Sequence, residues 1–118
     1  MEVERLIIGQ ESIEKRRRKL QCELERAVAE LKGMGAERIV LVGSMADGSI
    51  GPFSDVDLLV VMRTQEPFLQ RLRAAYERIL PRVAMDILIY TPEELEDLQT
   101  FSPFMRHALR KGRVLHAA

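Results

Sequence analysis

The sequence predicts a single α/β domain, and three observations lead to this prediction. Short apolar runs rich in β-branched residues lie at residues 38–43, 56–62 and 83–90, a composition typical of strands. Segments with apolar residues at helical spacing lie between and around them. The 118 residues contain no repeat, linker or low-complexity tract. We therefore expect one domain over residues 1–118, with residues 1–11 as an N-terminal extension.

Helical segments and a short helical turn complete this pattern. They are expected at about residues 12–31, 44–48, 66–80, 91–99 and 102–111. The glycines of "GMG" at 33–35 end the first helix. Pro67 suits the first turn of the helix that Pro81 ends. Thr91 is a suitable N-cap for the following helix, with Pro92 at the first helical position. The resulting order of elements is that of an α/β sheet whose strand ends can present a site.

Composition excludes several classes of protein. The formal net charge is zero, so no overall electrostatic field attracts the chain to a membrane or to nucleic acid. Nucleic acid is therefore not expected as a direct ligand. The single cysteine, Cys22, excludes an intramolecular disulfide and fits a reducing compartment. No apolar run approaches the roughly 18–20 residues of a membrane span, and the N-terminus lacks the pattern of a signal peptide. We therefore expect a cytoplasmic protein.

The stretch "LVGSMADGSIGPFSDVDLLVV" at residues 41–61 places two acids at the start of a predicted strand. Because side chains alternate along a strand, Asp55 and Asp57 point to the same face, together with Leu59. Two like charges on a buried face are unfavourable unless a cation or several donors compensate them. A third acid, Asp86, lies inside the third apolar run.

These carboxylates and the Gly43-Ser44 turn form a coherent set for a metal–nucleotide site. Mg²⁺ prefers carboxylate oxygens, water and substrate phosphates. Two such ions about 3.5–4 Å apart can activate an attacking hydroxyl and stabilise a leaving pyrophosphate. Asp55 and Asp57 would both be ligands, and Asp86 would hold the ion nearest the nucleophile and help take its proton. Gly43 lets the backbone approach phosphates closely, and amides at a helix start attract anions.

Each of these features has a plainer interpretation when it is taken alone. Ser-Asp before a strand is often only a turn with local side-chain bonding, and Asp-x-Asp is very common. Asp86 by itself suits a buried acid paired with an arginine. Gly-Ser by itself indicates no more than a turn. Only their joint order and spacing favour the metal site.

Other polar residues give weaker signals. The segment "EKRRRK" at 14–19 has a basic character that would suit RNA or an acidic partner, but the flanking glutamates favour a solvated helix face. His107 and His116 are interpreted as structural or surface residues unrelated to the acids. Candidate phosphate ligands, which the sequence cannot rank, are Arg63, Arg71 and Arg82.

The joint pattern resembles the nucleotidyltransferase superfamily of DNA polymerase β, most closely its minimal, single-domain members. The family pattern is Gly-Ser, ten residues, Asp-x-Asp, and a third acid on a later strand; Gly43-Ser44, Asp55-Val56-Asp57 and Asp86 match it in order and spacing. The resemblance covers about residues 20–116. Further positions that match the small members are Ala46, Gly48, Pro52, Ser54 and "KGRVLH" at 111–116.

Two departures lie beside the Gly-Ser turn. The family often has arginine at the positions of Met45 and Asp47. Loss of those guanidinium groups would weaken triphosphate binding or change the contacts with a partner.

The resemblance implies a small mixed sheet of three to four strands flanked by helices. It also implies an enzyme that uses two Mg²⁺ ions to transfer a nucleoside monophosphate from an NTP to a hydroxyl. The catalytic and metal-binding residues that it implies are Asp55, Asp57 and Asp86. The nucleotide-binding residues that it implies are Gly43, Ser44 and Ser54.

Minimal members usually act with a partner, typically a HEPN-domain protein, often as a toxin–antitoxin pair. The resemblance therefore implies transfer of AMP from ATP to a protein tyrosine. The alternative is a non-catalytic antitoxin that neutralises its partner by contact; the three acids favour the enzyme, whereas Met45 and Asp47 keep the alternative open. A generic metal- or RNA-binding domain is disfavoured by the neutral charge and low aromatic content. The oligomeric state, including a homo-oligomer, stays open.

Overall fold

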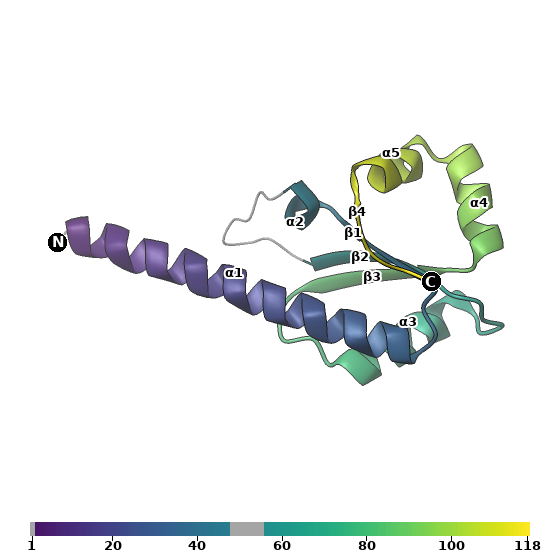
Figure 1. Cartoon of the computed structure of the whole chain (residues 1–118), viewed down its shortest axis with the longest axis horizontal. Helices are drawn as coiled ribbons and strands as arrows, with labels where there is room; N and C mark the ends of the chain where they lie inside the picture. The colour runs from purple at the N-terminus through teal and green to yellow at the C-terminus, as the bar shows by residue number, and fades with distance from the viewer. Residues whose placement is uncertain (1, 48–55) are drawn as a thin grey trace.

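The chain folds into a mixed four-stranded sheet with helices on both faces, as Figure 1 shows for this computed structural model. The structure describes residues 2–47 and 56–118, with side chains at 13–46 and 56–118. The elements are α1 (Glu2–Gly33), β1 (Arg38–Val42), α2 (Ser44–Asp47), β2 (Val56–Val61), α3 (Phe68–Ile79), β3 (Met85–Tyr90), α4 (Pro92–Phe101), α5 (Pro103–Lys111) and β4 (Arg113–Ala117). The predicted α/β class and mixed sheet are confirmed.

The strands lie in the order β3-β2-β1-β4. Strand β1 is antiparallel to both β2 and β4, whereas β2 and β3 are parallel. Strand β4 follows the three apolar runs, in a segment for which residue patterns alone predict no element. It pairs with the inner strand β1 and forms the edge of the sheet opposite β3.

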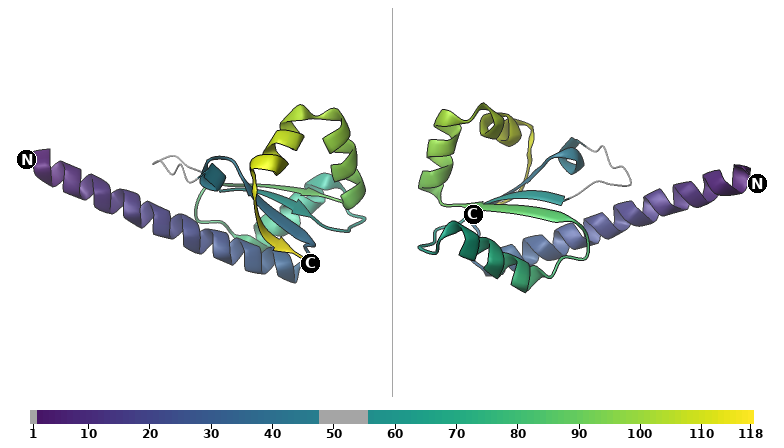
Figure 2. Two further views of the ribbon diagram at one scale, coloured as in Figure 1. Left: turned by 45° about the horizontal axis from the view of Figure 1, so that its top comes forward. Right: turned by 180° about the vertical axis from the view of Figure 1, so that it is seen from behind.

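Two cores lie on the two faces of the sheet. Helices α1 and α3 cover one face, and α4 and α5 lie on the other (Figures 1 and 2). The larger core, on the α1 and α3 side, contains Leu58, Val60 and Ile87, and the smaller one contains Leu59 and Val61. The alternation predicted for β2 is therefore correct for these residues.

Helix α1 is longer than predicted, and only its second half packs on the sheet. Its buried residues Leu20, Leu24, Ala27 and Leu31 recur at helical spacing and belong to the larger core. The first half projects beyond the sheet (Figure 1), and residues 2–11, expected as an extension, are its first turns.

Helix α3 is tied to α1 at its C-terminal end. Arg26 of α1 donates hydrogen bonds to the carbonyls of Ile79, at 2.6 Å, and Leu80, at 3.1 Å. Leu80 has φ 49°, so the chain leaves the helix in the left-handed conformation just before the predicted stop at Pro81. These bonds satisfy carbonyls that a helix end leaves without a partner.

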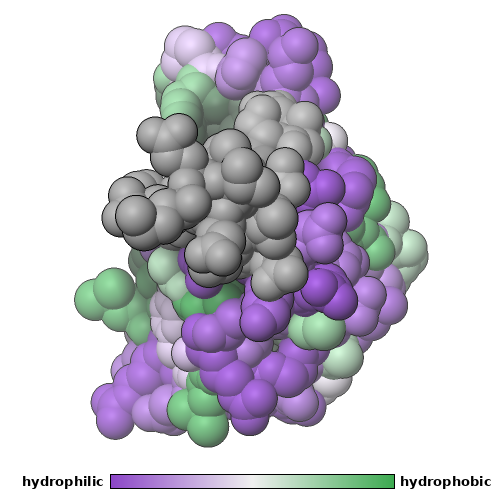
Figure 3. Space-filling view, turned by 90° about the vertical axis from the view of Figure 1, so that its left-hand side faces the viewer, coloured by the Kyte–Doolittle hydropathy of each residue, from purple (hydrophilic) through white to green (hydrophobic). Residues whose placement is uncertain are grey.

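The face of the molecule on the side where α1 projects is mostly polar (Figure 3). Viewed from the side on which α1 projects, hydrophilic side chains dominate and hydrophobic ones form separate small patches (Figure 3). Across residues 2–47 and 56–118, no helix combines the length and the apolar character needed to cross a membrane.

Candidate active site

Two of the predicted acids lie side by side on the sheet. Asp57 of β2 and Asp86 of β3 are paired in the parallel register, so their Cα atoms are about 5 Å apart. Asp57 is half-buried and Asp86 is exposed. The interpretation of Asp86 as a buried core acid is therefore wrong, because α4 and α5 leave this end of the sheet face open.

Gly43 brings the end of β1 against the first of these acids. It has φ 76°, and Val42 before it is the register partner of Asp57. A Cβ on Gly43 would collide with Oδ2 of Asp57 and lie 3.2 Å from its Cγ. Glycine is therefore required both for the backbone conformation and for the close approach to this carboxylate. Ser44, at the start of α2, is half-buried.

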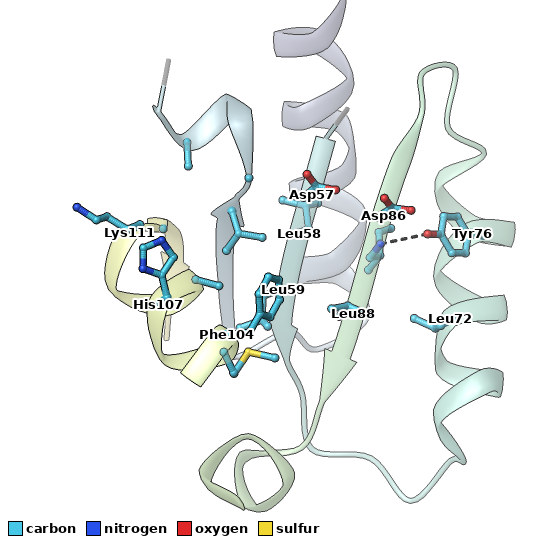
Figure 4. A pocket seen from close by; sticks show the side chains of 17 residues that line it. Asp57, Leu58, Leu59, Leu72, Tyr76, Asp86, Leu88, Phe104, His107 and Lys111 are labelled. Atoms are coloured by element: carbon cyan, nitrogen blue, oxygen red, sulfur yellow. Dashed lines mark hydrogen bonds between the residues drawn. The ribbon is translucent and has the colours of Figure 1, made fainter. Parts of the chain in front are cut away.

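A cavity of about 800 Å³ opens over this pair of acids (Figure 4). Gly43, Asp57 and Asp86 line it from the sheet, and residues of α3 and α5 form its other walls. His107 is exposed, which agrees with its interpretation as a surface residue, and it also lines the cavity from the α5 wall. It lines the cavity because α5 packs over the sheet face that carries the carboxylates. His116, by contrast, contacts the carbonyl of Ala36 at 3.2 Å, a structural role that agrees with its interpretation.

Tyr76 of α3 fixes the strand segment that carries Asp86. Its hydroxyl donates to the carbonyl of Met85 at 2.9 Å and accepts from the N–H of Ile87 at 3.1 Å, the bond dashed in Figure 4. These are the residues on either side of Asp86. Strand β3 is at the edge of the sheet, so this hydroxyl satisfies two groups that no neighbouring strand reaches. Sequence reasoning gives no role to Tyr76.

Arg71, a candidate phosphate ligand, has a structural role instead. It is buried, and its guanidinium contacts the carboxylate of Glu94 at 2.6 Å and donates to the carbonyl of Ile89 at 3.2 Å. The hydrogen bond from Arg71, together with the backbone N–H of Thr91, lowers the pKa of Glu94. Thr91 is the N-cap, as predicted, and Glu94 completes a capping box with it. Burial, and then the charge of Glu94, raises the pKa of Tyr90.

The positions around the Gly-Ser turn supply no arginine to the cavity. Met45, at a position where the family often has arginine, is 7% exposed and belongs to the larger core. The side chain of Asp47 lies outside the described residues. Arg63 is on another part of the surface, where it pairs with Glu37 at 2.9 Å.

The carboxylates of Asp57 and Asp86 are hard oxygen donors of the kind that Mg²⁺ prefers, and Gly43 leaves room beside them. Asp55 and Ser54 lie outside the described residues, so the set of three acids stays a prediction. Among the residues that the structure does describe, no three His, Cys, Asp or Glu side chains are grouped to hold a metal. The described pair therefore fits part of such a site.

Comparison with known proteins gives one clear result. No curated protein matches the sequence. The family model described as "Nucleotidyltransferase domain" matches residues 21–116, nearly the whole of the 118 residues. The mixed sheet flanked by helices is consistent with the fold of that family. The chain belongs to the nucleotidyltransferase domain family and is consistent with a minimal member of it.

Proposed function

We propose that this protein transfers a nucleoside monophosphate, AMP in the first instance, from an NTP to a hydroxyl group in a Mg²⁺-dependent reaction. Family membership supports nucleotidyl transfer in general. The observation that carries the specific proposal is the register pair of Asp57 and Asp86, which face an open cavity beside Gly43. Two neighbouring carboxylates beside an open cavity provide the oxygen donors that Mg²⁺ prefers, and this supports a metal site.

Asp57 and Asp86, joined by Asp55, are the residues proposed to hold the metal. When bound, Mg²⁺ would neutralise the charge of the phosphates and that of the leaving pyrophosphate. In the reaction the acceptor oxygen forms a bond to the α-phosphorus, and the bond from that phosphorus to the bridging oxygen of the β-phosphate breaks. Pyrophosphate leaves with the electron pair of that bond. Asp86, the exposed member of the pair, is the carboxylate placed to accept the proton of the hydroxyl.

A protein tyrosine on a HEPN-domain partner is the proposed acceptor. Support comes from the family resemblance and from the opening of the cavity. Phe104, which lines the cavity, is 75% exposed, and Phe101 nearby is 82% exposed. Exposed aromatic residues of this kind are enriched where proteins dock.

The test mixes the protein with the product of the neighbouring gene, Mg²⁺ and each labelled NTP in turn. We expect ATP to place label on that partner. The Asp55→Ala, Asp57→Ala double variant should still bind the partner and transfer nothing, because loss of metal ligands raises the barrier by several kcal/mol, or about 10³-fold in rate.

A contact-only antitoxin is the second candidate. The observation that favours it is Met45, which is buried in the core and leaves the cavity without the arginine often found there. If the double variant still neutralises the partner and no NTP gives label with the unchanged protein, the contact mechanism is correct and the transfer reaction is refuted.

A further inference from the structure

One wall of the cavity is a single face of α5. Phe104, His107, Ala108 and Lys111 all line the cavity, and their spacing of three, four and seven residues places them on one side of the helix. Lys111 is exposed and makes no ion pair with any residue between 13–46 or 56–118. Apart from the exposure of Phe104, this stripe has no role in the proposal above.

The topology orients this stripe relative to the acids. Strand β4 follows α5 directly, and its first residue, Arg113, is the register partner of Leu41 near the end of β1. The C-terminal end of α5 therefore lies at the Gly43 end of the sheet. Phe104 is seven residues before Lys111, which is about 10 Å along the helix axis. Figure 4 draws Lys111 level with the acids, with its exposed side chain extending away from them in this view, and Phe104 at the level of Leu59 and Leu88.

The sheet side of the cavity also changes from charged to apolar in the direction that leads from Lys111 to Phe104. Leu59 and Leu88 are each two residues beyond an acid on its own strand, about 7 Å farther along the same face. Leu72 and Met105 continue the apolar surface. The hydroxyl of Tyr76, which also lines the cavity, is already bonded to the backbone of β3.

We propose that α5 orients the nucleotide, with Lys111 contacting the phosphates and Phe104 packing against the base. This inference rests on the proposed function. A magnesium–NTP complex is charged at its phosphate end and aromatic at its base. The cavity likewise has charged residues at the Gly43 end and apolar residues around Phe104 at the other. Lys111 supplies from the opposite wall the positive charge that residue 45 does not supply.

The inference also specifies how the base is selected. Most of the described side chains around Phe104 are apolar, and His107, one turn farther along α5, adds an imidazole to the same wall. Packing against a ring depends on its area, and a purine offers a larger face than a pyrimidine. ATP and GTP should therefore both bind more tightly than CTP or UTP.

The test measures binding by titration calorimetry, using Mg²⁺ with NTP analogues that carry a methylene bridge between the α- and β-phosphates. Lys111→Met should weaken binding of all four analogues about tenfold, the effect of losing one charge-assisted contact. Arg110→Met is its matched control, because it removes an adjacent cation that does not line the cavity. Both side chains are exposed, so both variants should fold.

Phe104→Ala should weaken binding of the purine analogues about tenfold and remove the preference for purines. Phe101→Ala, an equally exposed aromatic outside the cavity, should change neither.

The outcomes separate the two proposals. If the unchanged protein binds no analogue and transfers no label, the proposed function fails and the inference fails with it. If it binds and transfers, but both α5 variants behave like their controls, the inference alone is overturned. Equal binding of purines and pyrimidines, or a preference for pyrimidines, overturns selection by ring area.

Discussion

Gly43 offers the sharpest test of how the fold positions Asp57. An alanine at this position would have to adopt φ 76°, which costs about 1–2 kcal/mol for a residue with a Cβ. Its Cβ would also displace the Asp57 carboxylate, at an additional cost of about 0.5–1.5 kcal/mol if that side chain leaves its rotamer. We therefore expect Gly43→Ala to lower the free energy of unfolding by about 2–3 kcal/mol and to abolish binding of magnesium–nucleotide.

Gly35→Ala separates the effect of backbone strain from the effect of displacing the Asp57 carboxylate. Gly35 has φ 102°, so an alanine there meets at least comparable backbone strain, but no atom lies within 4 Å of the added Cβ. Urea unfolding should show a loss of stability for both variants. Calorimetry should show unchanged nucleotide binding for Gly35→Ala only. If Gly43→Ala binds magnesium–nucleotide as tightly as the unchanged protein, the argument that glycine is needed to place this carboxylate is refuted.

Three further predictions concern the neighbouring residues. Asp57→Asn and Asp86→Asn should each raise the metal-free melting temperature slightly, because adjacent like charges repel by a few tenths of a kcal/mol, and should abolish transfer; unfolding of either variant would make the acids structural. Tyr76→Phe should lower the free energy of unfolding by about 1–3 kcal/mol, measured in urea, since two edge-strand groups lose their partner; an unchanged value would contradict this. Arg71 lowers the pKa of Glu94, so this carboxylate stabilises the fold above its ordinary pKa of 4.5, and that stabilisation is lost as the pH falls through the lowered value. The stability difference between the unchanged protein and Glu94→Gln should therefore shrink in melts below about pH 4.5, and a constant difference would exclude the pair as its source.

Sequence by itself determined most of the elements and the residues proposed for the metal-binding end. Strand alternation in β2 and the N-cap at Thr91 depend on neighbours within a few residues, so local chemistry specifies them. The family pattern was recognisable for the same reason, since Gly43-Ser44 and Asp55-x-Asp57 lie within one short stretch. Local patterns also showed where α3 ends. The hydrogen bonds that Arg26 of α1 donates to this end of α3, by contrast, join residues more than fifty positions apart in the sequence.

Only the tertiary structure decided which residues share the cavity. The parallel register of β2 and β3 places Asp86 beside Asp57 across a connection that contains all of α3. The pairing of β4 with β1 brings Lys111 and His107 to the cavity that the acids also line. Although "KGRVLH" at 111–116 matches the family's small members, nothing in that segment signals a site. Pairing between distant strands and the packing of α5 across a sheet face are fixed by the burial of the whole core. No local pattern of residues contains that information.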